Sequence, residues 1–382
     1  MHAVIVGGGI VGLASAYALA DEGATVTVCE KGSIGSGSTE RSVGGIRAQF
    51  STPVNVDLSL ESMRVWETFE DRFGIDIEYR RTGYLFLART EAMADTFREN
   101  VAMQTDRGVP STFLEPEEAL EYCSGIRPEA FVGATYSPTD GFADPHLAVQ
   151  GYAQAATEAG ATVLTKTAVT DVRQDGGQVT GVETETGRLE ADVVVNAAGP
   201  WARQVAAMAD VSLPIAPRRR QLAVVEPETS VPESDPLAID MARGSYFRPE
   251  RDGDALVGGH FADVDPDHDP DAYSTSFDFD WAASALEAAA DWTTYFGPES
   301  GIKRGWAGLY AVTPDNHPIV EETAPGLITA AGFSGHGFQH APATGRLVAE
   351  LALDGEASLV DIDGLSSDRF VADERHVEQN VV

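Results

Sequence analysis

Three glycines near the N-terminus have the spacing of a loop that binds the phosphates of a nucleotide. Gly7, Gly9 and Gly12 form G-x-G-x-x-G directly after the apolar run 3–6, and an Ala-rich stretch follows up to Gly23. Such a loop turns tightly, lets the backbone approach a pyrophosphate and opens a helix whose N-terminal amides carry a partial positive charge. The spacing therefore predicts a dinucleotide site, although a glycine cluster in an ordinary turn is the alternative.

An acidic residue follows at the distance expected for a dinucleotide fold. The strand-like run 25–29 ends beside Glu30, which would accept hydrogen bonds from the ribose hydroxyls of the adenosine. Cys29 and Cys123 are too few and too far apart for a disulfide framework or a C-x-x-C metal site, so Cys29 is interpreted as a small core residue. Strand, loop, helix and acid in this order predict one βαβ unit.

The remaining elements must place this loop against the rest of the chain. Apolar residues at helical spacing predict helices over 55–73, 91–107, 145–159, 282–295 and 338–353. Buried-type runs predict strands over 83–88, 192–199 and 326–332, and short strands with Gly turns fill 161–191. Alternating, aromatic-rich segments between 218 and 305 suggest an antiparallel sheet.

This order of elements predicts an α/β fold with two domains. A doubly wound, Rossmann-like nucleotide domain takes residues 1–82, 144–217 and 305–382, and an inserted, mainly antiparallel α+β domain takes 83–143 and 218–304. The first, middle and last thirds of the chain thus meet in one domain. The polar tail after Asp361 is expected to fray.

Charge narrows the classes of partner. Lys plus Arg number 26 against 60 Asp plus Glu, a net charge of −34, which disfavours nucleic acid and anionic membranes as partners. No apolar run is long enough to span a membrane and the first apolar residues already belong to the fold, so we expect a cytoplasmic protein. So acidic a surface suggests adaptation to high salt, with an acidic mesophilic enzyme as the alternative.

Several further motifs together resemble the family of flavin-dependent amine oxidoreductases. This family includes D-amino acid oxidase, glycine oxidase, sarcosine oxidase and the dimethylglycine and proline dehydrogenases. The motifs extend from residue 4 to about residue 355, and they are 7–12 with Glu30, 38–47, 82–87, 196–201, 308–315 and 332–338. The resemblance implies a nucleotide domain of the glutathione reductase type that holds an extended FAD.

The resemblance also implies which residues bind this cofactor. Gly308 stands where monomeric sarcosine oxidases tether the flavin through a cysteine, so the FAD is expected to be noncovalent. The glycines before the last helix would present backbone amides to the flavin pyrimidine ring. The implied cofactor residues are Gly7, Gly9, Ile10, Val11, Gly12, Glu30, Lys31, Ser38, Thr39, Arg41, Ser42, Gly44, Gly45, Ile46, Val169, Ala197, Ala198, Gly199, Trp201, Gly308, Gly332, Gly335, His336, Gly337, Phe338 and Gln339.

Arg47 matches the arginine that holds the substrate carboxylate in sarcosine oxidases. Its planar donors suit a carboxylate, although a surface ion pair is the alternative. Gln339 replaces the lysine of that branch, and Tyr310 replaces an arginine of the glycine oxidase branch, so the substrate stays open. The predicted catalytic residues are Arg47, Tyr246 and His336, and the predicted substrate-binding residues are Arg47, Tyr246, Arg248, Tyr310 and Gln339.

Tyr246 and Arg248 alternate along one expected strand and would share a face, where the tyrosine could orient an amine or simply pack in the core. His336, flanked by glycines, could donate a hydrogen bond or tune the protonation of the substrate, and a purely structural role in the loop is the alternative. The acidic run 263–271 departs from an EF-hand at two positions, so a solvated loop without metal is expected.

The function implied by the resemblance is oxidation of the C–N bond of a small amine or (N-methyl) amino acid. A hydride would pass to flavin N5, and water would hydrolyse the imine. Oxygen or an electron carrier would take the electrons; Leu256 stands where an oxygen-activating lysine is expected, which keeps a dehydrogenase open. A flavin-binding electron-transfer or support subunit, within a homo- or hetero-oligomer, and an NAD-linked dehydrogenase are the alternatives.

Overall fold

The first of two large sheets carries the glycine loop. The computed structural model describes residues 1–262, 264–372 and 376–381. Its six-stranded sheet has the order β18-β19-β12-β1-β2-β8, parallel except for the antiparallel edge strand β18. The strands are β1 (His2–Val6), β2 (Thr25–Cys29), β8 (Thr162–Leu164), β12 (Val193–Asn196), β18 (Ile319–Ala324) and β19 (Leu327–Ala331).

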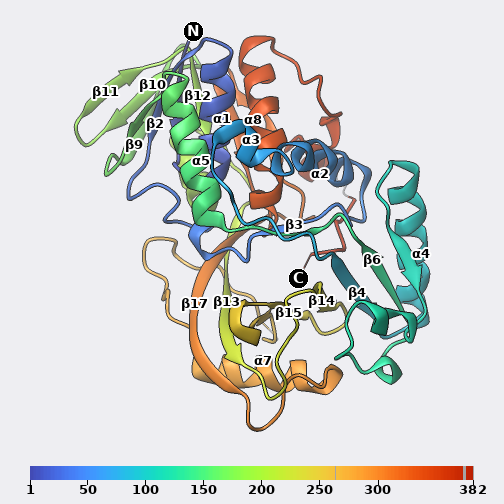
Figure 1. Ribbon diagram of the computed structural model, residues 1–382. Coiled ribbons are helices and arrows are strands. Elements are labelled where there is room, and N and C mark those ends of the chain that lie inside the picture. Colours follow the sequence, from blue (N-terminus) through green and yellow to red (C-terminus); the bar gives the residue numbers. More distant parts are fainter. Residues whose placement is uncertain (263, 373–375, 382) are drawn as a thin grey trace.

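Alternate residues of β1 pack into different layers. Ala3 and Ile5 pack against α1 (Ile10–Asp21) and α8 (Gly337–Leu353), beside α5 (Pro145–Glu158). Val4 and Val6 pack on the other face, against the meander β9 (Val169–Asp175), β10 (Gln178–Thr184) and β11 (Gly187–Glu190). Figure 1 shows the helices and the meander on opposite sides of the sheet. Two covered faces explain why the parallel strands read as continuous apolar runs.

The second sheet has eight strands in the order β17-β13-β16-β15-β14-β4-β6-β5. Neighbouring strands are antiparallel except β14 and β4. The strands are β4 (Tyr84–Ala88), β5 (Thr112–Leu114), β6 (Gly133–Ser137), β13 (Ala216–Glu226), β14 (Leu237–Asp240), β15 (Ser245–Pro249), β16 (Ala255–Gly259) and β17 (Gly301–Val312). The α/β class and the inserted antiparallel sheet are confirmed.

The expected segments 83–143 and 218–304 supply most of this sheet, but β17 continues to Val312. Helix α7 (Phe279–Trp292) covers one face, where Trp292 packs against Phe247, and it begins before the predicted residue 282 (Figure 1). Helix α4 (Glu91–Asp106) packs beside β4, β5 and β6. The remaining elements are β3 (Gly45–Ile46), β7 (Gly141–Phe142), α6 (Ala202–Ala207) and α9 (Arg369–Ala372).

One predicted helix is two helices. The stretch 55–73 contains α2 (Pro53–Trp66) and α3 (Phe69–Phe73), with a break at residues 67–68. The break lets the rings of Trp66 and Phe69 stack at a centroid distance of 5.4 Å, and Trp66 also stacks on Phe338 of α8. Tertiary packing of aromatic rings thus overrides the continuous helical period.

The prediction that the tail frays is wrong for the described residues 361–372 and 376–381. Leu365 is buried, and the Arg369 Nε donates to Asp315 Oδ2 at 2.7 Å. Glu378 and Asn380 are also buried. Polar residues were read as solvated, but here they meet buried partners from distant parts of the chain.

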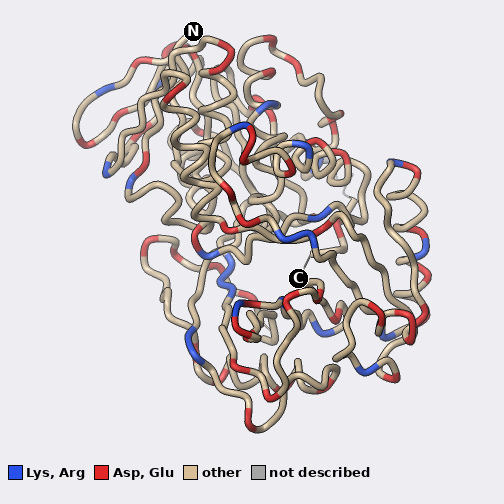
Figure 2. Tube along the Cα trace, viewed as in Figure 1, with Lys and Arg blue, Asp and Glu red and all other residues tan. Residues whose placement is uncertain are grey.

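Acidic residues occur along the chain in both parts of the molecule (Figure 2). Within the described ranges, the model contains no helix that is both long and apolar enough to cross a membrane. The same ranges contain no group of three or more His, Cys, Asp or Glu residues that could hold a metal ion. Asp263, the first residue of the acidic run, lies outside the described residues.

Candidate active site

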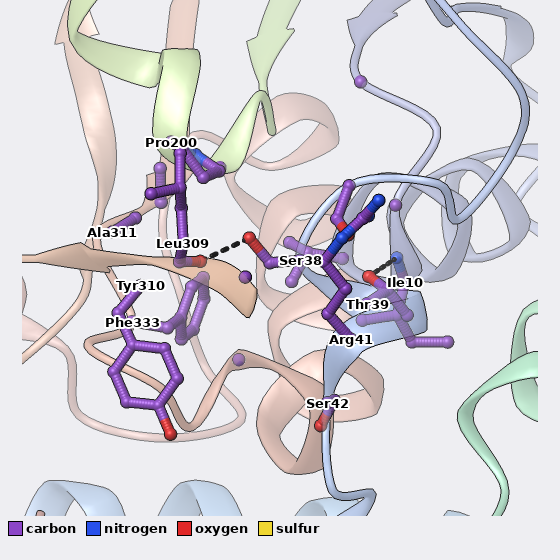
Figure 3. A pocket seen from close by; sticks show the side chains of 18 of the residues that line it. Ile10, Ser38, Thr39, Arg41, Ser42, Pro200, Leu309, Tyr310, Ala311 and Phe333 are labelled. Carbon is purple, nitrogen blue, oxygen red and sulfur yellow. Dashed lines mark hydrogen bonds between the residues drawn. The ribbon is translucent and has the colours of Figure 1, made fainter. Parts of the chain in front are cut away.

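A single cavity of about 910 Å³ runs from the glycine loop to the eight-stranded sheet. The parallel sheet and α1 border one end, and Tyr84, Tyr246 and Ile239 of the second sheet border the other. Figure 3 shows residues from the loop after β2 facing others from β17 across this space. Most predicted site residues line the cavity; Gly12, Gly44, Ile46 and Arg248 do not.

The end at α1 is made largely of backbone. Gly9 precedes the first helical residue and brings no side chain to the amides of the first turn. The Ile10 amide donates to Thr39 Oγ1 at 3.2 Å (Figure 3). A Cβ on Gly12 would lie 2.0 Å from the Gly7 oxygen, so Gly12 serves the close packing of the turn rather than the cavity wall. This helix end has the amides and the dipole that favour a phosphate.

Glu30 is held at the same end by two backbone amides. Its Oε2 accepts from the Gly8 amide at 2.8 Å and its Oε1 accepts from the Gly32 amide at 2.6 Å. Each carboxylate oxygen has a second lone pair, so Glu30 retains acceptors for hydroxyl groups in the cavity.

The acidic loop after β16 borders this end through Asp271, whose side chain stays 54% exposed. Asp271 lines the cavity, accepts from Trp201 Nε1 at 2.9 Å and pairs with Lys31, whose ammonium lies 4.1 Å from the centre of the Trp201 ring. The hydrogen bond from Lys31 lowers the pKa of Asp271. Asp265 likewise makes a two-pronged pair with Arg220. The loop is largely exposed, as expected, and what the sequence did not indicate is that basic side chains from the nucleotide part and β13 pair with it.

The loop between β19 and α8 forms the middle of the wall. Gly332 and Gly335 have φ of +79° and +96°, and Ser334 between them also has a positive φ of 49°. A Cβ on Gly335 would lie 2.3 Å from the Tyr310 ring, so only glycine lets that ring lie against the loop. The loop therefore delivers the N-terminus of α8 to the cavity, with Tyr310 of β17 packed on it.

The ring of His336 is part of a buried hydrogen-bond chain. Because the Asn316 carbonyl can only accept, His336 Nε2 donates to it at 2.9 Å, and His336 Nδ1 then accepts from His340 Nδ1 at 3.2 Å. His340 Nε2 in turn accepts from the Ser59 hydroxyl at 2.9 Å. Burial lowers the pKa of His336 to about 3. A neutral ring with both nitrogens bonded to protein favours the structural alternative over a hydrogen bond to the substrate.

Arg47 follows β3 and is a cation at the far end of the cavity. Its Nη1 donates to the Gln49 carbonyl at 2.6 Å, its Nη2 donates to the Asn380 carbonyl, and its guanidinium lies 3.9 Å from the centre of the Phe50 ring. The Arg47 amide donates to Gln339 Oε1 at 2.8 Å. Burial lowers the pKa of Arg47, and the residue lines the cavity. The surface ion pair considered as an alternative is excluded, because Arg47 is 8% exposed.

Tyrosines surround the space beside Arg47. Tyr84 of β4 and Tyr246 of β15 line the cavity from the two strands that flank β14, and Tyr310 lines it from β17. Burial raises the pKa of each of the three, so all are neutral hydroxyl groups at ordinary pH. Leu222, Leu237 and Ile239 line the same end. The chamber thus combines two arginines, neutral hydroxyls and apolar surface; of the two, Arg220 pairs with Asp265, whereas Arg47 bonds only to backbone carbonyls.

Comparison with known proteins assigns this architecture. Residues 2–351 match the sequence profile of a family described as FAD dependent oxidoreductase. The chain belongs to this family. Glycine oxidase from Geobacillus kaustophilus is 33% identical over 91% of this chain and 91% of its own length. An FAD-dependent oxidoreductase domain-containing protein 1 from Xenopus laevis is 31% identical over 99% of this chain and 84% of its own length.

The solved structures agree with this membership. The crystal structure of L-proline dehydrogenase from P. horikoshii has a TM-score of 0.89 and 34% identity, and the match covers 98% of this chain and 99% of that one. The protein is therefore an FAD-dependent oxidoreductase with the fold of these flavoenzymes.

The residues present fit FAD. The cavity is continuous from the amides at Gly9 to the N-terminus of α8, and a Cβ on Gly199 would meet nothing within 4 Å, so the backbone there is open to a ligand. If the pyrophosphate lies at the N-terminus of α1, Glu30 lines the part of the cavity where the adenosine ribose would bind. When bound, FAD supplies the acceptor for a hydride.

Arg248 is not in the chamber, contrary to the prediction. It shares the strand parity of Tyr246, but its guanidinium donates to the Pro249 carbonyl at 3.0 Å and lies 4.5 Å from the centre of the Phe142 ring on β7. Strand alternation predicts a common face but not how far a cavity extends along it.

The lining residues at this end that the sequence analysis missed include Tyr84, Arg220, Asn380 and Val381. Tyr84 belongs to a strand that the sequence does predict, and its alternation with Phe86 would have placed it on one face of that strand. Asn380 and Val381 lie in a tail whose composition gives no sign of burial.

Proposed function

We propose that this oxidoreductase oxidises the C–N bond of a small amino acid or N-methyl amino acid. The observation that carries the proposal is the position of Arg47, a buried cation beside three neutral tyrosines at the end of the cavity opposite the glycine loop. A guanidinium of this kind recognises a carboxylate by charge and by planar hydrogen bonds.

The chain supplies position rather than strong acid or base. Arg47 would hold the carboxylate, and the hydroxyls of Tyr246 and Tyr310 can accept from or donate to the nitrogen because burial keeps them neutral. Loss of a hydride from the adjacent carbon and of a proton from nitrogen gives an imine, which water converts to a carbonyl compound and an amine. Holding the reacting carbon in one orientation is the largest contribution that such a site can make.

The names of the relatives support this substrate class. One relative is a glycine oxidase, and the solved neighbour at 34% identity is an L-proline dehydrogenase. We infer for this chain a substrate of similar size that carries both a carboxylate and an amine.

We also propose that FAD is noncovalent and that an electron carrier rather than oxygen takes the electrons. Gly308 has no side chain to attach a flavin. The lysines of the chain are Lys31 and Lys166 near the adenosine end and Lys303, which pairs with Asp254. Among the described residues no lysine lines the tyrosine end. Its two arginines are Arg47, whose charge the substrate carboxylate would balance, and Arg220, which pairs with Asp265, so neither leaves an unbalanced positive charge to favour superoxide formation.

Anaerobic mixing of the purified holoprotein with glycine, sarcosine, dimethylglycine, proline and the D-amino acids tests the proposal. We expect at least one of them to bleach the yellow flavin band. A flavin that stays oxidised with the whole panel, yet accepts electrons from dithionite, would instead indicate a support or electron-transfer subunit.

A further inference from the structure

The last described residues of the chain reach the tyrosine end of the cavity. Asn380 and Val381 line it, whereas Val377 of the same segment is 49% exposed and lies outside it. Figure 1 shows the C-terminal end of the chain between β3 and the strands β14 and β15. The segment 376–381 thus comes back from the surface to the chamber that holds Arg47.

Glu378 anchors this segment in the nucleotide domain. Its Oε1 accepts from the Ser51 amide at 2.8 Å and the Ser51 hydroxyl at 2.6 Å. Its Oε2 accepts from Thr52 Oγ1 at 2.7 Å and Asn55 Nδ2 at 3.1 Å. Burial alone would raise the pKa of Glu378, but these hydrogen bonds lower it, so the carboxylate stays charged. A buried, fully bonded carboxylate holds a segment in one place.

Backbone groups of the segment are held as well. His317 Nε2 donates to the His376 carbonyl at 2.8 Å, and Asn316 Nδ2 donates to the Glu378 carbonyl at 3.0 Å. The Glu378 amide donates to the Asp315 carbonyl at 2.9 Å. These contacts come from the loop between β17 and β18, so the segment is fixed on two sides.

Asn380 connects the segment to the substrate cation. Its Nδ2 donates to the Gln49 carbonyl at 3.1 Å, and its carbonyl accepts from Arg47. Gln49 also accepts from Arg47, so the tail and the residue two places after Arg47 together hold the guanidinium. The donors of Arg47 that remain can meet only a ligand that fits beside Asn380 and Val381.

We propose that the segment 376–381 is a fixed wall of the substrate chamber and that Asn380 and Val381 limit the substrate to carboxylates with small side groups. This inference rests on the proposed function, because it takes Arg47 as the carboxylate site. On this proposal the segment 376–381 determines the size of the substrate, although its polar sequence alone suggests a solvated end.

The test compares the binding of acetate and benzoate to the holoprotein, followed by the change in the flavin absorption spectrum. In Val381→Ala we expect the ratio of the benzoate Kd to the acetate Kd to fall by about 10-fold, since small steric differences in a pocket discriminate by this factor or more. Val381→Trp should raise the ratio. Val377→Ala is the matched control, because it makes the same change in the same segment outside the cavity, and its ratio should equal that of the unchanged protein.

Glu378→Gln provides a second variant that weakens the anchor without altering the wall residues. It should lower the ratio in the same direction as Val381→Ala, and its melting temperature shows whether the rest of the protein stays folded.

The outcomes separate this inference from the proposed function. Equal ratios in Val381→Ala, Val381→Trp and the unchanged protein overturn the wall, even if amino acids bleach the flavin. No spectral response to either carboxylate in any variant overturns it too. A shifted ratio in a protein that oxidises none of the amines supports the wall and overturns the proposed function.

Discussion

The two ends of the cavity are built by different means. The end at α1 consists of backbone from the contiguous run 7–12, held by the side chains of Thr39 and Glu30. The tyrosine end consists of side chains from β4, β13, β14, β15 and β17, from Arg47 and from the tail. The backbone at the α1 end tolerates little added side-chain volume, whereas ligand binding at the tyrosine end depends on which side chains line it. Substitutions at the α1 end should therefore reduce FAD binding, and substitutions at the tyrosine end should reduce the use of the substrate.

At the backbone end, Gly12→Ala is expected to weaken binding of the cofactor itself. The new Cβ would lie 2.0 Å from the Gly7 oxygen, so the turn must open. Overpacking of this kind costs about 1–3 kcal/mol, and here it also displaces the amides that face the phosphates. We expect the affinity for FAD to fall at least about 10-fold, because a loss of ~1.4 kcal/mol in binding free energy changes Kd by that factor. Absorbance of the purified protein measures this loss.

Gly364→Ala is the control for that change, because its Cβ would meet nothing within 4 Å. Equal flavin content in the two variants would contradict the close packing inferred for Gly12.

At the side-chain end, Arg47→Lys should leave FAD content unchanged and weaken the use of a carboxylate substrate. Lysine keeps the positive charge but loses the planar pair of donors. A hydrogen bond to a charged group is worth about 1.5–3 kcal/mol, so kcat/KM should fall by roughly 10-fold or more. Arg248→Lys is the matched control, since Arg248 does not line the cavity. Steady-state kinetics with the amino acid that the protein oxidises fastest measure kcat/KM for both variants. A similar loss of kcat/KM in both would indicate that Arg248 also contributes to the substrate site.

Three buried histidines, His317, His336 and His340, predict that the stability of the protein depends on pH. Burial lowers the pKa of His317, His336 and His340, so the unfolded chain binds more protons below about pH 6.5 and stability falls as the pH falls. His336, with its pKa of about 3, contributes roughly 1 kcal/mol between pH 7.5 and 5.5, and His317 and His340 act in the same direction. Burial raises the pKa of Asp140 to about 6, so the folded protein binds a proton there and this group stabilises the fold as the pH falls. This is one proton against the three of the histidines, so the net stability still falls.

Denaturant unfolding at the two pH values measures this effect. His340→Gln should reduce the difference, and the change His146→Gln at an exposed site should leave it as it is. A protein as stable at pH 5.5 as at pH 7.5 would show that the buried rings are not held neutral.

The smallest effect concerns the surface that both ends share. A net charge of −34 predicts that added salt relieves repulsion, so the melting temperature should rise between dilute buffer and molar salt. Each kcal/mol of relief is worth roughly 2–4 °C. Scanning calorimetry checks the direction, and a flat or falling melting temperature would remove the case for salt adaptation.

The sequence predicts the backbone end better than the side-chain end for a physical reason. Gly7, Gly9, Gly12 and Glu30 act through local spacing along one βαβ unit, so a contiguous pattern is enough. The chamber depends on contacts between residues that are hundreds of positions apart, such as Asn380 with Arg47. No local period carries that information.

The same contrast explains the individual errors. Strand parity placed Arg248 beside Tyr246, but the reach of the cavity is set by packing between sheets. Glycines around His336 pointed to a reactive edge, whereas its tautomer is fixed by His340 and Asn316. The tail was judged by its polarity, and its buried partners come from Ser51 and neighbouring residues.

The most direct test of the central claim is the rate of anaerobic flavin reduction by small amino acids, measured for the unchanged protein and for Arg47→Lys at several substrate concentrations. The two-ended cavity predicts that at least one amino acid bleaches the flavin, and that the variant, with equal FAD, needs a much higher concentration for half-maximal rate. Reduction with the same concentration dependence in both proteins, or none in either, would contradict it.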